Sequence, residues 1–488
     1  MLAMHYSIWP MMNRSYLVIL FCCIHFTFYS QNVNIDIHFE NPVFDHASVG
    51  LTIIDAESGE TVYNHNGNLA LIPASTLKTV TTFSALELLG PEFRFKTSLF
   101  LQGEKLGDGS FYGNLILKGS GDPSLGSPFF EKALGLDEIK SRIVKAIKAE
   151  GISCIEGTIL IDNSLFEGSP VNETWQWNDL SNYYASGVWP FNIHENLFYI
   201  NFDRSIEEFQ PTSISYLLPK IPNIIIQSNV ITGAMGSGDN AYVYSHPFSS
   251  DLQIVGTIPP GKDLFQIKAA IPNPGEYIKS ELIAYFDENG ITTSKDSLTN
   301  RSVSDPTEFI SFTSAPLSEI VREANLKSNN LYCEAILKSI GTTISEKGST
   351  NKGIKAVKNF LRLLELDVKS FTYKDGSGLS NRNRIPTAFI ASYLQKIYQL
   401  HSSKYLEEHL SHASPDGDVT YLFNDSNEEY QVHLKSGSMS QVMAYCGIIQ
   451  FDEKKYCFSF ISNGHLQGNR RIRVAFEHII QDFIQGRT

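Results

Sequence analysis

The spacing of apolar residues changes twice along this chain, and each change predicts a different kind of structure. Residues 47–55 and 61–65 read as two strands joined by a turn at 56–60. From about residue 74 to residue 89 the apolar residues recur at helical spacing, and Gly90 is a natural stop. We therefore expect a strand hairpin followed by a helix that begins near residue 74.

The middle of the chain, from about residue 92 to residue 310, consists mostly of short apolar runs separated by Gly, Asn, Asp and Pro. Such a pattern is typical of β-rich structure. Helical spacing is rarer here and occurs at 136–150 and 275–288. The predicted strands are 97–102, 113–118, 157–162, 197–202, 221–230, 241–244 and 251–258. A region of this length suggests one or two domains placed inside the first.

Helical spacing returns after residue 310, and strands follow it before the end of the chain. The predicted helices are 317–326, 331–340, 352–366, 387–400 and 470–484, and the predicted strands are 430–435, 441–451 and 455–462. Because strands occur near both ends of the chain, we expect one sheet built from both ends. The predicted fold class is α/β (α+β), with an inserted β-rich region.

The first thirty residues have the pattern of a leader. Arg14 precedes an apolar run at 16–28 that ends in small and polar residues, as in a secretory signal peptide. The run is short for a membrane span. A lipid anchor on Cys22 or Cys23 is the alternative, although a bulky residue precedes them. We expect a signal peptide at 1–30 and an exported, periplasmic chain, soluble or loosely membrane-associated, with no stable membrane span.

Composition narrows the partners. The chain has 488 residues, of which 42% are hydrophobic, and a formal net charge of −13. Its length predicts about two to four domains, and its acidity argues against a nucleic-acid partner, which would need a basic face. The four cysteines beyond the leader are too few to hold the fold together. Cys446 and Cys457 fall on two strands of one predicted hairpin and could pair; the favoured alternative is two buried apolar side chains.

Ser75 and Lys78 are the first residues that could carry chemistry. They stand three apart at the predicted helix start, so one helical face can bring them together. Burial in this apolar stretch would lower the pKa of the lysine and let the neutral amine take the serine proton. The free N–H groups of a helix start also suit an oxyanion. The same Ser-x-x-Lys pattern recurs at Ser349 and Lys352, but in a polar loop where nothing would bury the lysine.

Two further short motifs follow. Ser-Asn-Asn at 328–330 falls at the turn between two predicted helices, and Lys-Ser-Gly-Ser at 435–438 falls on a predicted strand. On an edge strand, a lysine, a hydroxyl and a glycine can bind a carboxylate and expose backbone to a substrate alongside. Taken singly, each motif has an equally good structural explanation, as a cap serine, a surface lysine or a turn glycine.

The order of the three motifs resembles that of the penicillin-recognising serine enzymes: Ser-x-x-Lys, then Ser-x-Asn, then Lys-Ser/Thr-Gly. The gap of 253 residues between Ser75 and Ser328 is far longer than a simple β-lactamase needs. With that gap, the chain resembles the D-alanyl-D-alanine carboxypeptidase/endopeptidase family of the penicillin-binding protein 4 type, peptidase family S13. Other stretches resemble segments of the same family, namely 119–125, 258–261 with 271–274, 315–325 with 330–334, and 375–380.

The resemblance implies a serine β-lactamase/transpeptidase-like fold, an antiparallel sheet flanked by helices, with inserted β-rich domains. We expect the catalytic, penicillin-binding domain at 31–92 and 308–488. We expect an inserted domain II at 93–215 and 275–307, and a small β-rich domain III at 216–274.

The resemblance also implies catalytic roles, residue by residue. Ser75 would be the nucleophile that attacks the carbonyl between two D-alanines, and Lys78 would be its general base. Ser328 would relay a proton to the leaving amine, helped by Lys435. Backbone N–H groups of Ser75 and Ser438 would form the oxyanion hole.

Substrate contacts follow from the same motifs. Asn330 would bind the backbone amide of the substrate, while Lys435 and the Ser436 hydroxyl would hold its terminal carboxylate. Gly437 would leave the strand backbone open to the substrate. The usual residue at 436 is Thr, and Ser keeps the hydroxyl.

Recognition of the substrate side chain would involve the inserted region. In the family, an acidic residue there binds the free amino end of the diamino acid of the peptide; Asp179 would take that role, with Tyr184 packed beside it. The alternative is that Asp179 caps a helix or a turn. Relatives often carry an arginine directly after the 375–380 stretch, where it pairs with a substrate carboxylate. Asn381 occupies that position here, and Arg382 follows it.

The resemblance therefore predicts an exported serine carboxypeptidase and D,D-endopeptidase that acts on peptidoglycan stem peptides and is acylated by β-lactam antibiotics. It predicts no cofactor, because nucleophile, base and oxyanion donors are all protein groups. We find no His, Cys and Glu set with metal-ligand spacing; His409 and His412 are expected on a solvated helix face. Two rivals stay open: a β-lactamase-like hydrolase and a non-catalytic cell-wall-binding protein.

Overall fold

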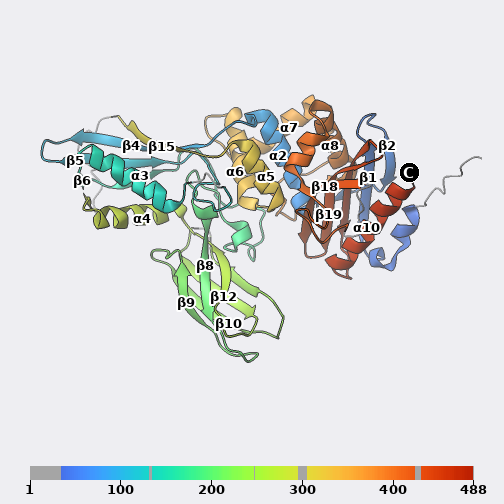
Figure 1. Cartoon of the computed structure of the whole chain (residues 1–488), viewed down its shortest axis with the longest axis horizontal. Helices are drawn as coiled ribbons and strands as arrows, with labels where there is room; N and C mark the ends of the chain where they lie inside the picture. Colours follow the sequence, from blue (N-terminus) through green and yellow to red (C-terminus); the bar gives the residue numbers. More distant parts are fainter. Residues whose placement is uncertain (1–34, 131–133, 247, 295–304, 424–429, 487–488) are drawn as a thin grey trace, which may run out of the picture.

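Figure 1 shows the protein as a computed structural model with one helix-covered sheet at one end and two β-rich lobes built from the middle of the chain. The structure describes residues 35–130, 134–246, 248–294, 305–423 and 430–486. The predicted signal peptide at 1–30 lies outside the described residues.

The main sheet combines strands from both ends of the chain. Its order is β17-β18-β19-β20-β1-β2, so the first strand lies beside the last. The strands are β1 (Ser48–Asp55), β2 (Thr61–His65), β17 (Ser411–His412), β18 (Tyr430–Met439), β19 (Val442–Phe451) and β20 (Lys454–Asn463). Each neighbouring pair is antiparallel. The antiparallel sheet expected from the two ends of the chain is confirmed.

Helices cover both faces of this sheet. Because side chains alternate along a strand, Tyr445 of β19 packs with α10 (Asn469–Gln485) on one face. Cys446 joins the cluster on the other face, which includes α2 (Lys78–Leu89). That second face also carries α5 (Leu317–Leu326), α6 (Asn330–Ile340), α7 (Thr350–Leu363), α8 (Thr387–Leu400) and α9 (Ser403–His409).

The helix predicted from residue 74 begins there, but its first turn is tighter than an α-helix. A 3₁₀ turn, η3 (Ala74–Leu77), leads directly into α2. Side chains from Lys78 through Leu86 are all buried, so α2 runs through the interior until its last turn. Its polar threonines are satisfied locally: Thr79 donates to the Thr76 carbonyl and Thr82 to the Lys78 carbonyl, both at 2.8 Å.

The inserted region forms further sheets. One contains β4 (Lys96–Lys105), β5 (Ser110–Lys118) and β15 (Thr307–Thr313), and packs against α3 (Leu136–Ala149) and α4 (Pro274–Glu288). Short strands β6 (Cys154–Glu156), β7 (Ile159–Asp162) and β14 (Thr292–Thr293) extend it.

Two three-stranded sheets make up the remaining lobe, whose strands Figure 1 labels β8, β9, β10 and β12. The strands of the first are β8 (Leu197–Asp203), β9 (Ser213–Leu218) and β13 (Phe265–Ala270); those of the second are β10 (Ile225–Thr232), β11 (Asn240–Tyr244) and β12 (Asp251–Ile258). The β-rich texture expected between residues 92 and 310 is confirmed, while the domain boundaries stay a prediction.

Cys446 and Cys457 do not form the disulfide that their positions on one hairpin allow. Cys446 lies opposite Ser459, and Cys457 lies opposite Ile448, so the two cysteines are out of register across the hairpin. All four cysteines of the described residues are free. Both hairpin cysteines are fully buried, as the alternative interpretation expects.

The solvated helix face predicted for His409 is also wrong. His409 ends α9 with only 5% of its surface exposed, and its Nδ1 lies 2.8 Å from the Tyr405 carbonyl. Within the described residues no cluster of His, Cys, Asp and Glu side chains could hold a metal ion. In the same residues, no helix combines the length and apolar character needed to cross a bilayer.

Candidate active site

Lys78 lies at the centre of the site. Its Nζ is 2.8 Å from Ser75 Oγ, 2.6 Å from Asn330 Oδ1 and 2.8 Å from the Ser377 carbonyl. A neutral amine fits these three partners, since it can donate to the two carbonyl oxygens and accept from the Ser75 hydroxyl. The side chain is fully buried, and burial lowers the pKa of Lys78 from its usual range. The expected meeting of Ser75 and Lys78 on one helical face is therefore found.

The second and third motifs meet in the same way. Lys435 Nζ donates to Ser328 Oγ at 3.0 Å and to the Ser436 carbonyl at 2.7 Å. Burial, and then the charge of Lys78, lower the pKa of Lys435 to about 7. Ser328 itself has a left-handed backbone with φ of 54°, which is uncommon for a residue with a side chain.

Gly437 explains how the strand approaches the nucleophile. A Cβ added to Gly437 would lie 2.7 Å from the Ser75 backbone nitrogen and 2.9 Å from that of Thr76. Only glycine permits this contact, which sets β18 against the first turn of the helix. It brings Ser438, the next residue on the strand, to the turn that carries Ser75.

The outer edge of β18 is open beside the motif. Among the described strands, β17 pairs only with His433 and Leu434, and residues 435–439 pair with β19 alone. The expectation of an edge strand for Lys-Ser-Gly-Ser is confirmed. Strand addition by an extended peptide uses such an edge.

Asn330 joins the catalytic lysine to the inserted region. Its Oδ1 accepts from Lys78 Nζ, and its Nδ2 donates to the Tyr184 carbonyl at 2.7 Å. Both ends of the amide therefore have a protein partner, which fixes its orientation, and the amide has a second N–H that a substrate could use. The loop that carries Tyr184 is tied in this way to the first residue of α6.

The 375–380 stretch, which resembles a segment of the family, supplies the third contact of Lys78. Asp375 is completely buried and accepts from the backbone N–H groups of Gly378 at 2.9 Å and Ser380 at 2.6 Å. Trp175 Nε1 and Asn383 Nδ2 also donate to it. This carboxylate holds the tight turn that presents the Ser377 carbonyl to the lysine.

Glu334 is a functional candidate that sequence reasoning missed. Its Oε1 accepts from the Ser377 backbone N–H at 2.8 Å. Burial, together with the charge of Asp375, raises the pKa of Glu334 to about 7. Its position on α6, four residues after Asn330, was the available signal, since residues four apart share a helix face.

Asp179 and Tyr184 lie together, as the family resemblance implies. Tyr184 donates its hydroxyl to Asp179 Oδ1 at 3.3 Å, and burial raises the pKa of both groups. The backbone of Gln176 also hydrogen-bonds to the Asp179 carboxylate, so a turn-capping role stays open. Arg382, in contrast, is exposed, and its backbone N–H donates to Ser380 Oγ at 3.2 Å.

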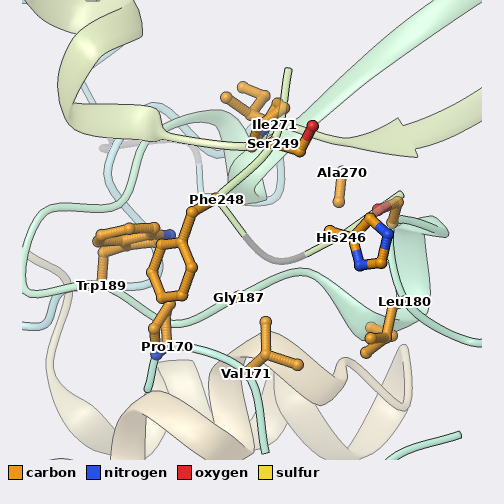
Figure 2. A pocket seen from close by; sticks show the side chains of 13 residues that line it. Pro170, Val171, Leu180, Gly187, Trp189, His246, Phe248, Ser249, Ala270 and Ile271 are labelled. Atoms are coloured by element: carbon orange, nitrogen blue, oxygen red, sulfur yellow. The ribbon is translucent and has the colours of Figure 1, made fainter. Parts of the chain in front are cut away.

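A small cavity of about 40 Å³ lies beside the same loop. Figure 2 shows Trp189, Phe248 and His246 around it, with Leu180 and Val171 nearby. No residue of the three motifs lines this cavity, so it is distinct from the candidate active site.

The second Ser-x-x-Lys pattern has the structural role expected of it. Ser349 is the N-cap of α7, and its hydroxyl accepts from the Lys352 backbone N–H at 3.4 Å. Lys352 Nζ forms an ion pair with Glu167 at 2.8 Å. The Lys352 ammonium is thus paired with groups other than the Ser349 hydroxyl, which caps the helix.

The arrangement defines a class of protein: a serine and a buried lysine at the start of a central helix, a second serine facing a second lysine, and an open strand edge. It is the site of the penicillin-recognising serine hydrolases. The profile of the D-Ala-D-Ala carboxypeptidase 3 (S13) family matches residues 31–480. The chain belongs to this serine peptidase family.

Relatives cover most of the chain. It is 25% identical over 448 residues to a D-alanyl-D-alanine carboxypeptidase from Actinomadura sp. (strain R39), covering 88% of this chain and 80% of that protein. It is 24% identical over 439 residues to the D-alanyl-D-alanine carboxypeptidase DacB of Haemophilus influenzae, covering 89% of each chain.

Solved structures confirm the fold. Penicillin binding protein 4 (dacB) from Haemophilus influenzae superposes with a TM-score of 0.80 at 23% identity, covering 93% of this chain and 99% of that one. The same protein complexed with a β-lactam superposes with a TM-score of 0.74 at 21% identity, covering 92% and 99%. The β-lactamase/transpeptidase-like fold predicted from the resemblance is thus confirmed.

Proposed function

We propose that this chain is a serine D-Ala-D-Ala carboxypeptidase and D,D-endopeptidase that cleaves peptidoglycan stem peptides and is acylated by β-lactams. The observation that carries the proposal is the contact of Ser75 with a fully buried Lys78, beside Ser328 and Lys435. The family and the functions of its named relatives support the same reading.

Acylation begins at Ser75. Neutral Lys78 takes the Oγ proton across the 2.8 Å contact, and Ser75 Oγ attacks the carbonyl between two D-alanines. The bond from Oγ to carbon forms while the carbonyl π electrons move to oxygen. The resulting oxyanion accepts from the backbone N–H groups of Ser75 and Ser438. The lowered pKa of Lys78 supports this role, because more of the lysine is neutral at a given pH.

The next step is departure of the leaving group, the D-alanine amine. When the tetrahedral carbon collapses, the bond to the D-alanine nitrogen breaks, and Ser328 passes a proton to that nitrogen, helped by Lys435. Lys435 and the Ser436 hydroxyl hold the terminal carboxylate, and Gly437 keeps the strand edge open. Water then hydrolyses the ester and frees Ser75.

Recognition of the rest of the peptide falls to residues around this centre. Asn330 binds a backbone amide of the substrate, and Asp179 with Tyr184 receives the amino end of a diamino acid. The peptide cross-link that joins two stem peptides binds along the open edge of β18. Exposed Arg382 is available to a substrate carboxylate, although the usual arginine position is taken by Asn381.

We also propose that the enzyme acts outside the cytoplasm, in the periplasm, where its substrate is assembled into the cell wall. The leader-like pattern at 1–30 supports export. The partners proposed are stem peptides and β-lactams. No organic or metal cofactor is assigned to the reaction.

The test is mass spectrometry of purified pentapeptide and cross-linked muropeptides before and after incubation with wild type and Ser75→Ala. Loss of one D-alanine, or conversion of dimers to monomers, is expected with wild type alone. If Ser75→Ala retains either activity, the assignment fails.

A parallel incubation with fluorescent penicillin separates the rivals. A slow-decaying adduct on wild type supports the peptidase, whereas rapid turnover of penicillin supports a β-lactamase-like hydrolase. A chain that binds wall material but neither forms an adduct nor releases D-alanine is a non-catalytic wall-binding protein.

A further inference from the structure

The inserted region places a buried carboxylate directly against the second motif. Glu195 precedes β8, and only 7% of its surface is exposed. Its Oε1 accepts from Ser127 Oγ at 2.8 Å and from the Tyr332 hydroxyl. Its Oε2 accepts from Asn329 Nδ2 at 3.0 Å. Asn329 is the residue between Ser328 and Asn330, so this carboxylate contacts the middle of the Ser-Asn-Asn turn.

The backbone around Glu195 is strained. His194, Glu195 and Asn196 have φ values of 50°, 57° and 53°, three successive left-handed residues with side chains. Each such residue costs free energy and persists only where its surroundings fix it. Two contacts do so: the His194 backbone N–H donates to the Leu125 carbonyl at 3.0 Å, and Asn196 Oδ1 accepts from the Ile193 backbone N–H at 3.1 Å. Strain kept in place at one carboxylate points to a role for that carboxylate.

The side-chain amide of Asn329, in the Ser-Asn-Asn turn, is held in one orientation. Asn329 is the N-cap of α6, and its Oδ1 accepts from the Tyr332 backbone N–H at 3.3 Å. Because the amide oxygen serves this cap, the amide nitrogen must point away from it, toward Glu195. Ser328, the residue before, is itself left-handed. The cap and the carboxylate together leave Asn329 one orientation.

We propose that Glu195 is a positioning residue for Ser328, which it aligns with Lys435 and the substrate by holding Asn329 in one orientation. The proposal rests on the proposed function of Ser328 as a proton relay. The inserted region would thereby complete the catalytic centre and not merely enlarge the substrate site.

Hydrogen bonds and one nearby charge offset the cost of burying the Glu195 carboxylate. Removing its charge from water disfavours the ionised form, and burial accordingly raises the pKa of Glu195. Hydrogen bonds from Tyr332, Ser127 and Asn329, and the charge of Lys268, oppose that rise. The three donors fill both oxygens, which is what a buried carboxylate needs in order to remain rigid.

The decisive variant is Glu195→Gln, because it keeps shape and changes one atom. With its oxygen on Ser127 and Tyr332, the glutamine points its amide nitrogen at Asn329 Nδ2, donor against donor, and Asn329 must then give up its cap. A flipped amide would instead point its nitrogen at the two hydroxyls, and this is opposed because Ser127 Oγ already accepts from the Phe129 N–H and from Tyr332. We expect the rate constant for acylation of Ser75 by fluorescent penicillin, per titrated site, to fall by about 10-fold or more.

A second change reverses the polarity of the contact. In the double variant Glu195→Gln with Asn329→Asp, the introduced carboxylate accepts from the introduced amide and from the Tyr332 backbone N–H. We expect the acylation rate constant to recover to within about 3-fold of wild type. Asn329→Asp alone sets two carboxylates face to face, and we expect it to be as slow as Glu195→Gln.

Ser127→Ala is the matched control, since it removes a donor from the other oxygen of the same carboxylate. We expect it to lower the unfolding temperature while leaving the acylation rate constant per titrated site within about 2-fold of wild type. Counting sites with radiolabelled penicillin after a long incubation corrects every rate for unfolded protein.

Two results would overturn the proposal. One is a Glu195→Gln variant that acylates at the wild-type rate per site; the other is a double variant no faster than the single variants. Failure of the proposed function would look different, because wild type itself would then form no penicillin adduct at Ser75.

Discussion

At the scale of the residue, the chemistry of this protein depends on which lysine is charged. Lys78 and Lys435 are both buried, and burial lowers the pKa of each. The charge of Lys78 lowers the pKa of Lys435 further. Two neighbouring buried cations disfavour each other, so an arrangement with one neutral base and one cation is favoured.

The first prediction concerns Lys78. Lys78→Arg should reduce acylation of Ser75 by about 10³-fold, because a guanidinium stays protonated in proteins and cannot act as the base. Stopped-flow measurement with fluorescent penicillin checks this. The control is Lys352→Arg, at the second Ser-x-x-Lys pattern, which should acylate like wild type. Equal rates for Lys78→Arg and wild type would remove Lys78 from the mechanism.

A second prediction concerns Gly437. In Gly437→Ala, the new methyl group would lie 2.7 Å from the Ser75 backbone nitrogen, so the strand or the helix start must move. Since displacements of about 1 Å can cost about 100-fold in rate, we expect a loss of that order in acylation. Gly135→Ala is the control, because an added Cβ there meets nothing within 4 Å. A crystal structure of the variant with an unmoved strand would contradict the argument.

A third prediction follows from the pKa of about 7 for Lys435. At lower pH the lysine is protonated in both states, and burying the charge disfavours folding. Between about pH 7 and about pH 10 only the unfolded chain binds the proton, so this lysine's contribution to the free energy of unfolding rises with pH. Lys435→Met should therefore be more stable than wild type by on the order of 2 kcal/mol near neutral pH or below.

Urea unfolding across that pH range measures this effect. The stability advantage of Lys435→Met should shrink as the pH rises, while activity is absent throughout. If the stability difference stayed constant with pH, burial of the Lys435 charge would not be what lowers the stability of wild type.

At the scale of the element, periodicity predicted most helices well. The predicted bounds of α5 and α8 agree with the structure at both ends. Both helices have one apolar face toward the core, which is the pattern that helical periodicity detects. Helix α2 differs, since it is buried all round through Leu86, and the 3₁₀ turn before it lies in close contact with Gly378 and Gly437.

Strands β9 and β13 of the inserted region were not predicted from the sequence. In β9 the side chains are mostly exposed without a clean alternation, since a bulge at Ser215 shifts the register of this strand against β8. In β13 the alternation of Phe265, Ile267 and Ala269 is visible in the sequence, so this strand was predictable. Neither strand changes the catalytic centre.

The site was predictable as far as its three motifs reach. Ser75, Lys78, Ser328 and Lys435 meet as the order of the motifs implies. The contacts of Glu195 were not predictable, because they join residues 68 to 137 positions apart through a buried network with no short pattern. Long-range partners of this kind depend on the fold and not on local spacing.

A fourth prediction separates the two Ser-x-x-Lys patterns at the level of their helices. Ser349→Ala removes the N-cap of α7 and should cost about 1 kcal/mol of stability, because one backbone N–H loses its acceptor. Its acylation rate should match wild type, whereas Ser75→Ala should form no adduct. Thermal unfolding and penicillin labelling of the two variants measure both effects. An inactive, fully folded Ser349→Ala would contradict this division.

At the scale of the whole molecule, the fold is held without disulfides in the part that the structure describes. Cys333, Cys446 and Cys457 are buried, while Cys154 is partly exposed. Burial raises the pKa of Cys333 and of Cys446 to about 12, which leaves both as unreactive thiols.

The fifth prediction uses this contrast. In a chain beginning at residue 31, a thiol reagent should label Cys154 alone while the protein is folded, and all four cysteines after denaturation. Reducing agent should leave the unfolding temperature unchanged. Cys154→Ser is the control and should remove the native labelling. Labelling of Cys446 at the same rate as Cys154 would mean that the hairpin opens in solution.

The position of β1 has a consequence for how the protein is made. This strand lies between β2 and β20, and Ser48 of β1 pairs with Asn463 of β20, so one of its two neighbours is synthesised long after it. Until β20 arrives, a growing chain carries the nucleophile and the start of α2 with one edge of β1 unpaired. Pairing over such a distance is slow and leaves apolar surface exposed meanwhile. We therefore expect that a nascent chain cannot attack peptide bonds before β20 has been synthesised, and that its unpaired strand favours aggregation until then.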